Sequence, residues 1–257
     1  MEKQYSVVIN CGHGKSSNGS WDPGTVYNGM TEASLMMPIT KAFVKYARSS
    51  GIKVYSDSDT GNDKNVVTGI AWANRLDVDV FISIHCDWYK AAAGTLPLYC
   101  KGSTKGKRLA ICLNTYVKKY TGIRTRGVTA RTDLGELNQT NMPACIFETG
   151  SIKADRYEWD TAVECDEYGK ALAMGLCKYF GIPFKEPEEE TILFRCKVTA
   201  KSLNRRKGPG TNYAKNGSLK KGVICSIVKT KTVKNVKWGK LKNGTGWVCL
   251  KYTKKIK

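Results

Sequence analysis

The chain has 257 residues and a formal net charge of +20 at pH 7, with 41% hydrophobic and 25% charged residues. This length can form one substantial core and a small second domain, and the composition excludes a disordered or low-complexity chain. The longest apolar runs, at residues 80–84 and 171–177, fall far short of the about 20 residues that span a bilayer, so we expect no membrane insertion. The ten cysteines contain no C-x-x-C pair, and we expect them to be reduced and mostly buried.

The positive charge is distributed unevenly along the chain. Residues 191–257 carry 19 of the 42 Lys and Arg residues and none of the 22 Asp and Glu residues. Residues 185–190 read Lys-Glu-Pro-Glu-Glu-Glu, a polar segment with a proline that is typical of a linker. We therefore predict a first domain at 1–184, a linker at 185–190 and a second domain at 191–257.

In the first domain, short apolar runs alternate with longer segments of helical period, which predicts an α/β fold with a mostly parallel, twisted sheet flanked by helices. The predicted strands and helices follow in chain order. Strands are expected at 5–10, 52–55, 78–84, 96–100, 127–130 and 144–147, and helices at 31–48, 65–76, 105–120 and 162–179.

The second domain has a different pattern. Short segments rich in Val, Ile, Thr and Lys are divided by Gly208-Pro209-Gly210, Asn216-Gly217 and Asn243-Gly244-Thr245-Gly246. Glycine, asparagine and proline at this spacing mark turns between strands. The pattern therefore predicts a small all-β barrel.

The chain has only two histidines, and each follows a predicted strand. His13 comes after the run at 5–10, and His85 comes directly after the run at 78–84. Glu148 ends a third such run, at 144–147. Because ligand sites of open α/β sheets form at the carboxyl ends of the strands, we expect these three side chains to meet in one crevice.

Two histidines and one carboxylate are a typical ligand set for catalytic zinc, which keeps a further position for water or substrate. A second carboxylate is then needed to move a proton from the water to the leaving group. Glu32 is the best candidate for the additional acid, at the start of a helix that Thr31 can cap. An acid in this position also complements a helix dipole without binding a metal, and the residue pattern alone leaves both interpretations open.

Residues 5–181 resemble the zinc-dependent N-acetylmuramoyl-L-alanine amidases of the Amidase_3 type, a family that includes bacterial autolysins and phage endolysins. The resemblance implies that His13, Glu32 and His85 bind one Zn²⁺ ion, that Glu148 is the catalytic acid and base, and that peptidoglycan is the substrate. The matching motifs are Gly12-His13-Gly14, Thr31-Glu32-Ala33, Ser83-Ile84-His85-Cys86-Asp87 and Pro143-Ala144-Cys145-Ile146-Phe147-Glu148-Thr149-Gly150.

Further positions concern the substrate. Arg75 and Asp87 fall in regions of the motif pattern where substrate binding is expected. Three residues depart from the family pattern: Lys15 replaces a second glycine, Asp87 an asparagine, and Ser151 an aromatic residue. None of these departures removes a predicted zinc ligand, so they bear on peptide and cross-link preference more than on the reaction.

Three motifs follow one another in the second domain. They are Leu203-Asn204-Arg205-Arg206-Lys207-Gly208-Pro209, Trp238-Gly239-Lys240-Leu241 and Gly246-Trp247-Val248. With these motifs the domain resembles bacterial SH3 (SH3b) domains, which commonly bind peptidoglycan. Tyr213 and Trp238 are candidate ligand-binding residues, although the barrel core is an equally good place for the tryptophan. As the partner of the basic charge we favour the cell wall, including its anionic polymers, over nucleic acid or a merely solvated surface.

The expected function is hydrolysis of the amide bond between N-acetylmuramic acid and L-alanine, with the basic domain holding the enzyme on the wall. The alternatives are a zinc peptidase that cuts within the stem peptide or cross-bridge, and an inactive wall-binding adaptor. The apolar run near residue 5 is too short for a Sec signal. We therefore expect synthesis in the cytoplasm, action on the wall after release, and a phage or prophage endolysin as the source.

Overall fold

The computed structural model describes residues 3–16, 18–59, 66–188, 191–242 and 244–256. Two compact units are present, unit 1 at Met1–Pro187 and unit 2 at Glu188–Lys257, and each has its own hydrophobic core. Asn65, predicted to begin a helix, and Glu189 and Glu190 of the predicted linker lie outside the described residues.

Unit 1 is built on a six-stranded sheet in the order β6-β1-β7-β10-β8-β9. The first four of these strands are parallel, whereas β8 pairs antiparallel with β10 and parallel with β9. The predicted mostly parallel sheet flanked by helices is confirmed. The strands are β1 (Ser6–Cys11), β6 (Lys53–Tyr55), β7 (Val80–Asp87), β8 (Leu96–Cys100), β9 (Thr129–Arg131) and β10 (Ala144–Ser151).

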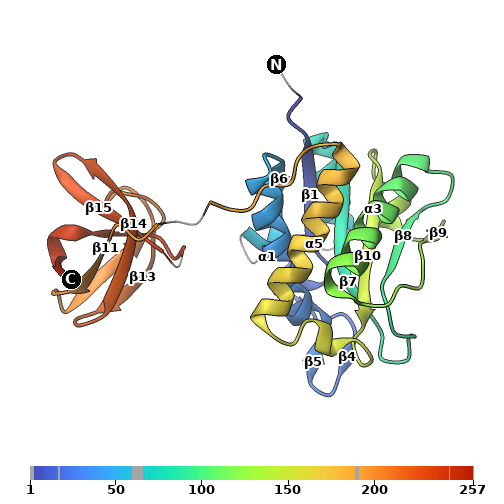
Figure 1. Cartoon of the computed structure of the whole chain (residues 1–257), viewed down its shortest axis with the longest axis horizontal. Helices are drawn as coiled ribbons and strands as arrows, with labels where there is room; N and C mark the ends of the chain where they lie inside the picture. The colour runs from blue at the N-terminus through green and yellow to red at the C-terminus, as the bar shows by residue number, and fades with distance from the viewer. Residues whose placement is uncertain (1–2, 17, 60–65, 189–190, 243, 257) are drawn as a thin grey trace. The chain divides into compact units, whose positions relative to one another are not determined.

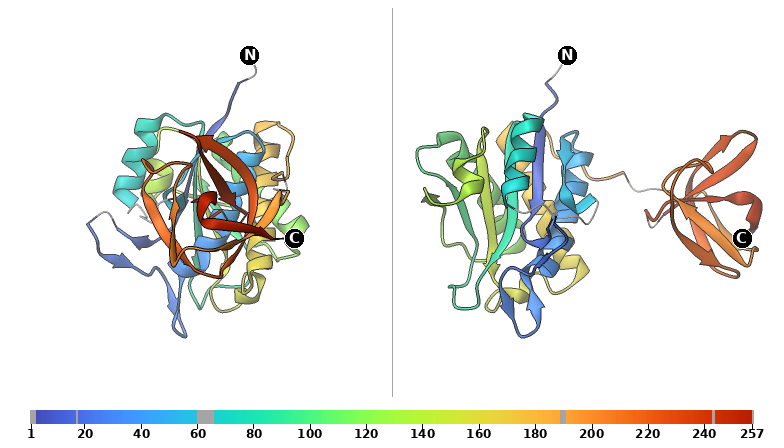
Figure 2. Two further views of the ribbon diagram at one scale, coloured as in Figure 1. Left: turned by 90° about the vertical axis from the view of Figure 1, so that its left-hand side faces the viewer. Right: turned by 180° about the vertical axis from the view of Figure 1, so that it is seen from behind.

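Helices cover both faces of this sheet (Figures 1 and 2). The helices α1 (Glu32–Ser49), α3 (Thr104–Thr121) and α5 (Ala162–Phe180) share the larger core with one face. The shorter helices α2 (Val66–Leu76) and α4 (Gly135–Asn138) pack on the other face. Threonine and serine caps begin the long helices as expected for these residue types, with Thr31 Oγ1 accepting a hydrogen bond from the Ser34 amide.

Alternation along β7 decides which side chains face which helices. Ile82 and Ile84 point into the core shared with α1, α3 and α5. Phe81 points to the opposite face of the sheet. His85 lies an even number of residues further along β7, so its side chain is on the same face as Phe81. In β10, Ile146 and Glu148 lie on that same face, and Glu148 is directly opposite His85 in the register.

The strands β7 and β10 run further than the sequence predicts, so His85 and Glu148 lie within strands instead of after them. Their pairing continues through the Glu148 and His85 positions. Several short elements precede α1 or follow the longer ones and have no counterpart among the predictions. They are β2 (Gly14–Lys15), β3 (Trp21–Asp22), β4 (Val26–Tyr27), β5 (Met30–Thr31) and the 3₁₀ turns at Asp57–Asp59 and Arg156–Glu158.

Unit 2 is an all-β structure, as its sequence pattern predicts, in which every strand pairing is antiparallel. Its seven strands follow the order β13-β12-β16-β15-β14-β11-β17. A 3₁₀ turn, η3 (Leu250–Tyr252), precedes the last strand. The strands are β11 (Phe194–Val198), β12 (Ser202–Arg206), β13 (Lys215–Lys220), β14 (Ile224–Val233), β15 (Val236–Leu241), β16 (Trp247–Cys249) and β17 (Thr253–Ile256).

Eight of the ten cysteines are buried, and Cys100 and Cys112 are partly exposed. This agrees with the expectation of mostly buried cysteines. Among the described residues, none of the helices has the length and apolar character needed to cross a bilayer.

Candidate active site

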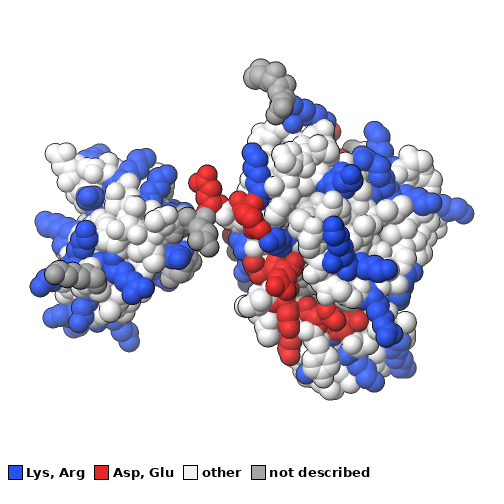
Figure 3. Space-filling view, in the orientation of Figure 1, with Lys and Arg blue, Asp and Glu red and all other residues white. Residues whose placement is uncertain are grey.

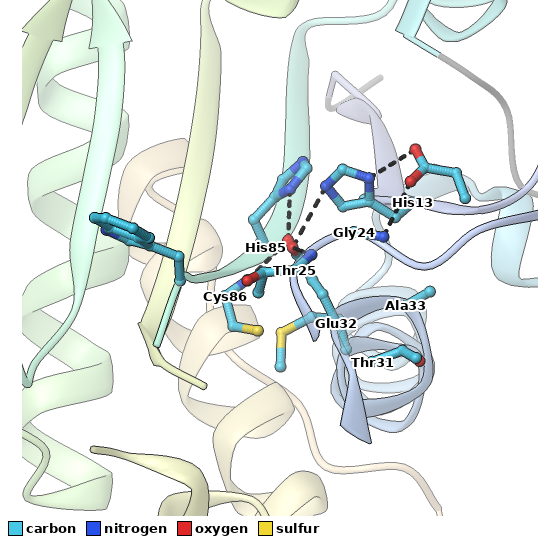
Figure 4. A network of polar contacts seen from close by, with 12 residues as sticks. His13, Gly24, Thr25, Thr31, Glu32, Ala33, His85 and Cys86 are labelled. Carbon is cyan, nitrogen blue, oxygen red and sulfur yellow. Dashed lines mark hydrogen bonds and ion pairs between the residues drawn. The ribbon is translucent and has the colours of Figure 1, made fainter. Parts of the chain in front are cut away.

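His13, Glu32 and His85 come together at one end of the parallel strands (Figure 4). One ligand atom from each of the three side chains lies within 4.8 Å of the other two. Glu32 lies between the imidazoles, with Oε1 2.9 Å from Nδ1 of His85 and Oε2 3.4 Å from Nε2 of His13. His13 and His85, which are 72 positions apart in the chain, thus direct one nitrogen atom each toward the carboxylate of Glu32.

The Glu32 carboxylate is held by backbone amides as well as by the histidines. It begins α1, it is 3% exposed, and its oxygens accept hydrogen bonds from the amides of Thr25 and Cys86. Burial raises the pKa of Glu32, but hydrogen bonding and charge from His85 and His13 outweigh it and lower the pKa below its usual value. The carboxylate is therefore ionised and fixed in place, as a metal ligand needs to be.

Two glycines give these side chains room. A Cβ atom on Gly12 would lie 2.2 Å from the His85 ring, and one on Gly24 would lie 2.6 Å from both Oε2 of Glu32 and the His13 ring. Gly24 also has a left-handed φ of 66°. Gly12, which precedes His13 in the chain, is therefore needed to make room for His85, because the backbone at Gly12 passes directly beside the His85 ring.

Each histidine has a second polar partner on its outer nitrogen. Nδ1 of His13 lies 2.8 Å from Oδ2 of Asp22, which the small β2–β3 pairing brings back beside it. Nε2 of His85 lies 3.0 Å from the Ser83 hydroxyl and 3.7 Å from Oε2 of Glu136. Such outer partners fix the tautomer and the orientation of metal-binding imidazoles.

Sequence reasoning missed Asp22 and Glu136. Asp22 is followed by Pro23-Gly24, a turn signal that could have shown that the chain reverses toward His13. Glu136 lies in the four-residue helix α4 and is only 8% exposed. No local pattern distinguishes it from an exposed acid in a turn, because its burial depends on packing against α2 and β10.

His13 itself has an unusual backbone. Its φ of 67° lies in the left-handed region that non-glycine residues rarely adopt. Strain of this kind persists where surrounding structure enforces it, and it gathers at functional sites. Here it aims the ring at Glu32, while Asp22 holds its far side.

Glu148 lies opposite His85 in the β7–β10 register. Its Oε2 atom is shielded from solvent and has no hydrogen-bond partner among the described residues. Burial raises the pKa of Glu148 to about 7, and the charges of Glu32 and Asp87 act in the same direction while that of His85 opposes them. At neutral pH this carboxyl group is therefore divided between its proton-accepting and proton-donating forms.

A cavity of about 310 Å³ opens beside the two histidines. Asp22 and Glu136 also line it, together with Asn10, which is 2% exposed and whose side-chain oxygen has no partner among the described residues. A small, partly polar cavity next to a candidate metal group is a suitable place for the reacting part of a substrate.

The three candidate ligands do not include Asp87 or Arg75, which are predicted to bind substrate. Asp87 is close in sequence, but its Oδ2 accepts two hydrogen bonds of 3.0 Å from the Arg126 guanidinium. Arg75 is exposed in the last turn of α2, before β7 begins, whereas His85 is near the opposite end of that strand. Tyr213 and Trp238 belong to unit 2.

The chain matches the protein family described as N-acetylmuramoyl-L-alanine amidase over residues 7–178. Unit 1 is also similar in fold to solved structures. An N-acetylmuramoyl-L-alanine amidase from Clostridium difficile 630 superimposes with a TM-score of 0.60, at 22% identity over 70% of this chain and 98% of that one. The amidase AmiC2 of Nostoc punctiforme gives a TM-score of 0.61, at 22% identity over 70% of this chain and 99% of that one.

Among curated proteins, an uncharacterized 38.4 kDa protein of Clostridium perfringens is 28% identical over an alignment of 205 residues that covers 70% of this chain. The match spans only 58% of that relative's length, and a second protein of the same species is matched over 34% of its length. The family match covers the sheet, the long helices and every residue of the candidate site. The chain therefore belongs to the N-acetylmuramoyl-L-alanine amidase family.

Proposed function

We propose that the chain is a zinc-dependent peptidoglycan hydrolase that cleaves the amide bond between N-acetylmuramic acid and L-alanine. The observation that carries this proposal is the convergence of His13, Glu32 and His85, with Glu148 on the adjacent strand, whose Oε2 atom has no hydrogen-bond partner among the described residues. Family membership supports the choice of this amide bond over others.

The donor set fits zinc. Two imidazole nitrogens and one carboxylate are the ligands of many catalytic zinc sites, and the three candidate ligand atoms already lie within reach of a common point. When bound there, zinc would polarise the scissile carbonyl group and make a water molecule more acidic. His13, Glu32 and His85 would hold the ion, and Asp22 and Glu136 would hold the two imidazole rings.

Glu148 performs the proton transfers in this proposal. As a carboxylate, its Oε2 atom accepts a proton from the attacking water, and as an acid it donates that proton to the departing amide nitrogen. Both roles need a group whose pKa is near the working pH, and burial raises the pKa of Glu148 to about 7.

Unit 2 is proposed to hold the enzyme on the wall, as its resemblance to SH3b domains implies. Support comes from its separate all-β fold and from the excess of basic residues over 191–257. A tethered binding unit raises the local concentration of the catalytic unit at the substrate without changing the chemical step.

The test is mass spectrometry of the products released from a defined muropeptide that carries both sugar and stem peptide. The expected products are an intact stem peptide with a free L-alanine amino group and a muramic acid without peptide. Fragments cut within the stem peptide would instead establish a peptidase. An intact muropeptide after prolonged incubation with added zinc would favour a binding adaptor and refute the proposed catalysis.

A further inference from the structure

A groove of about 780 Å³ runs across unit 2, far larger than the cavity beside the histidines of unit 1. Its floor is apolar and consists of the buried side chains of Leu203, Trp238 and Cys249. Polar side chains such as Asn204 and Asn212 occupy its flanks. A ligand in it would meet carbon-rich surface below and hydrogen-bonding groups at the sides.

One wall of the groove is fixed by Arg206. Its guanidinium donates hydrogen bonds to the carbonyl oxygens of Thr211 and Tyr213, which ties the turn after Gly210 to strand β12. The Tyr213 ring also lies directly over Gly208, where a Cβ atom would be only 2.4 Å away. This wall is therefore preorganised, which lowers the entropic cost of binding.

Two further segments that line the groove each contribute a lysine. Lys234 and Asn235 form the two-residue turn of the β14–β15 hairpin, with left-handed φ values of 47° and 61°, as such hairpin turns require. Lys251 lies in η3, whose backbone is tied to the sheet by a hydrogen bond from the Thr199 amide to the Tyr252 carbonyl. Both lysines are exposed and both line the groove.

No acidic residue balances these charges locally. Residues 191–257 contain 19 Lys and Arg residues and no Asp or Glu, and no acid is among the described residues that line the groove. In Figure 3, the part of unit 2 formed by residues 191–257 accordingly shows lysine and arginine and no acidic surface. An uncompensated positive field of this kind attracts polyanions and favours their binding over that of neutral glycans.

We propose that this groove binds the phosphate groups of an anionic wall polymer, a chain in which phosphodiesters join hydroxylated carbon units. Lys234, Lys251 and Arg206 pair with the phosphates, the asparagines hydrogen-bond to hydroxyl groups, and the apolar floor contacts the carbon skeleton. The inference rests on the proposed attachment of unit 2 to the wall and specifies its ligand. The membership of unit 1 in a peptidoglycan amidase family favours this polyanion over nucleic acid.

The experiment measures sedimentation of the full chain with purified cell walls, before and after the phosphate polymers are removed by acid extraction. The Lys234→Gln/Lys251→Gln variant is compared with Lys197→Gln/Lys229→Gln, which removes the same charge from exposed positions outside the groove. We expect extraction, and the groove variant, to weaken binding by at least about tenfold, since charge-assisted hydrogen bonds are lost. The control variant should stay within about threefold of the wild type, because only diffuse attraction is reduced.

Equal binding to intact and extracted walls would overturn the inference and make peptidoglycan itself the ligand, while leaving wall attachment in place. Equal losses in the two variants would replace the groove with a diffuse charge effect. Preferential binding to duplex DNA over intact wall in a competition at the same salt concentration would assign the groove to nucleic acid. Absence of binding to either wall would refute wall attachment too, but the products formed from a soluble muropeptide would still report on the amidase proposal.

Discussion

The Oε2 atom of Glu148 is shielded from solvent and has no hydrogen-bond partner among the described residues, which is a costly state for a carboxylate oxygen. The cost is reduced when the group is protonated, and burial accordingly raises its pKa to about 7. Buried carboxylates normally accept hydrogen bonds from neighbouring groups, as Glu32 does from two backbone amides. The contrast between these two glutamates separates the proposed proton carrier from the proposed ligand.

We expect Glu148→Gln to lower the rate of amide hydrolysis by about 10²- to 10⁴-fold, the usual contribution of a general acid and base. The matched control is Glu167→Gln, the same chemical change at an exposed position of α5. The measurement is product formation from a soluble muropeptide, with zinc content determined for all three proteins. A Glu148→Gln enzyme with wild-type rate would refute the assigned role.

Glu136 and Asp22 are expected to act as positioning residues, since each lies on the outer nitrogen of a proposed zinc-binding histidine. We predict that Glu136→Gln weakens zinc affinity by about 10- to 100-fold, the usual effect of removing such a partner. Competition with a chromophoric chelator measures this directly, without any assay of activity. Asp22→Asn should act in the same direction through the other imidazole.

The chelator competition tests the proposed zinc site and the positioning role of Glu136 separately. A wild-type chain that binds no zinc would contradict the proposed metal. Equal zinc affinities of the wild type and the Glu136→Gln variant would contradict only the positioning role of Glu136. Glu167→Gln again serves as the control.

At the scale of elements, sequence periodicity located every major helix and sheet strand of unit 1 because these patterns are local. Thr31 caps α1 and Gly181 ends α5 in the left-handed conformation, both readable from residue type. The short β2–β3 pairing was not predicted, since two residues carry no periodicity. That pairing nevertheless carries Asp22 to His13.

The contact between α5 and α1 offers a test of element packing. A Cβ atom on Gly169 would lie 2.5 Å from both the Ala42 Cβ and the Phe43 amide nitrogen. Gly169→Ala should gain about 1 kcal/mol of helix propensity but lose more through overpacking, which typically costs about 1–3 kcal/mol. We therefore expect a net loss of stability, seen as a lower Tm in thermal unfolding.

Gly135→Ala is the matched control, because the nearest atom to its added Cβ, Cδ1 of Ile70, lies 3.4 Å away. This variant should unfold within about 0.5 kcal/mol of the wild type, the range of substitutions that disturb no packing. Equal stability of the Gly169→Ala and Gly135→Ala proteins would contradict the close approach of α5 to α1.

At the scale of the whole molecule, the two units have separate hydrophobic cores and different surface features. Unit 1 carries all the candidate catalytic residues, and unit 2 has the larger groove and the denser positive charge. Under the proposed function, cleavage of a small soluble substrate needs only unit 1, whereas action on an insoluble wall benefits from both units.

We predict that a fragment ending at Pro187 hydrolyses a soluble muropeptide within about twofold of the full chain but releases material from intact walls at least about tenfold more slowly, since it loses the avidity of the tether. Circular dichroism checks that the fragment is folded. Equal rates on walls would contradict the anchoring role of unit 2. A folded fragment without activity on the soluble substrate would show that unit 2 takes part in catalysis.

The sequence by itself determined the α/β pattern of unit 1, the all-β pattern of unit 2 and the two histidines and Glu148 as candidates, because periodicity, turn residues and motif spacing are local properties. Only the tertiary structure decided that Glu32 lies between the histidines, that Asp22 and Glu136 lie on their outer nitrogens, and that Asp87 pairs with Arg126. These relations join residues far apart in the chain. They depend on strand register and helix packing, which no single segment encodes.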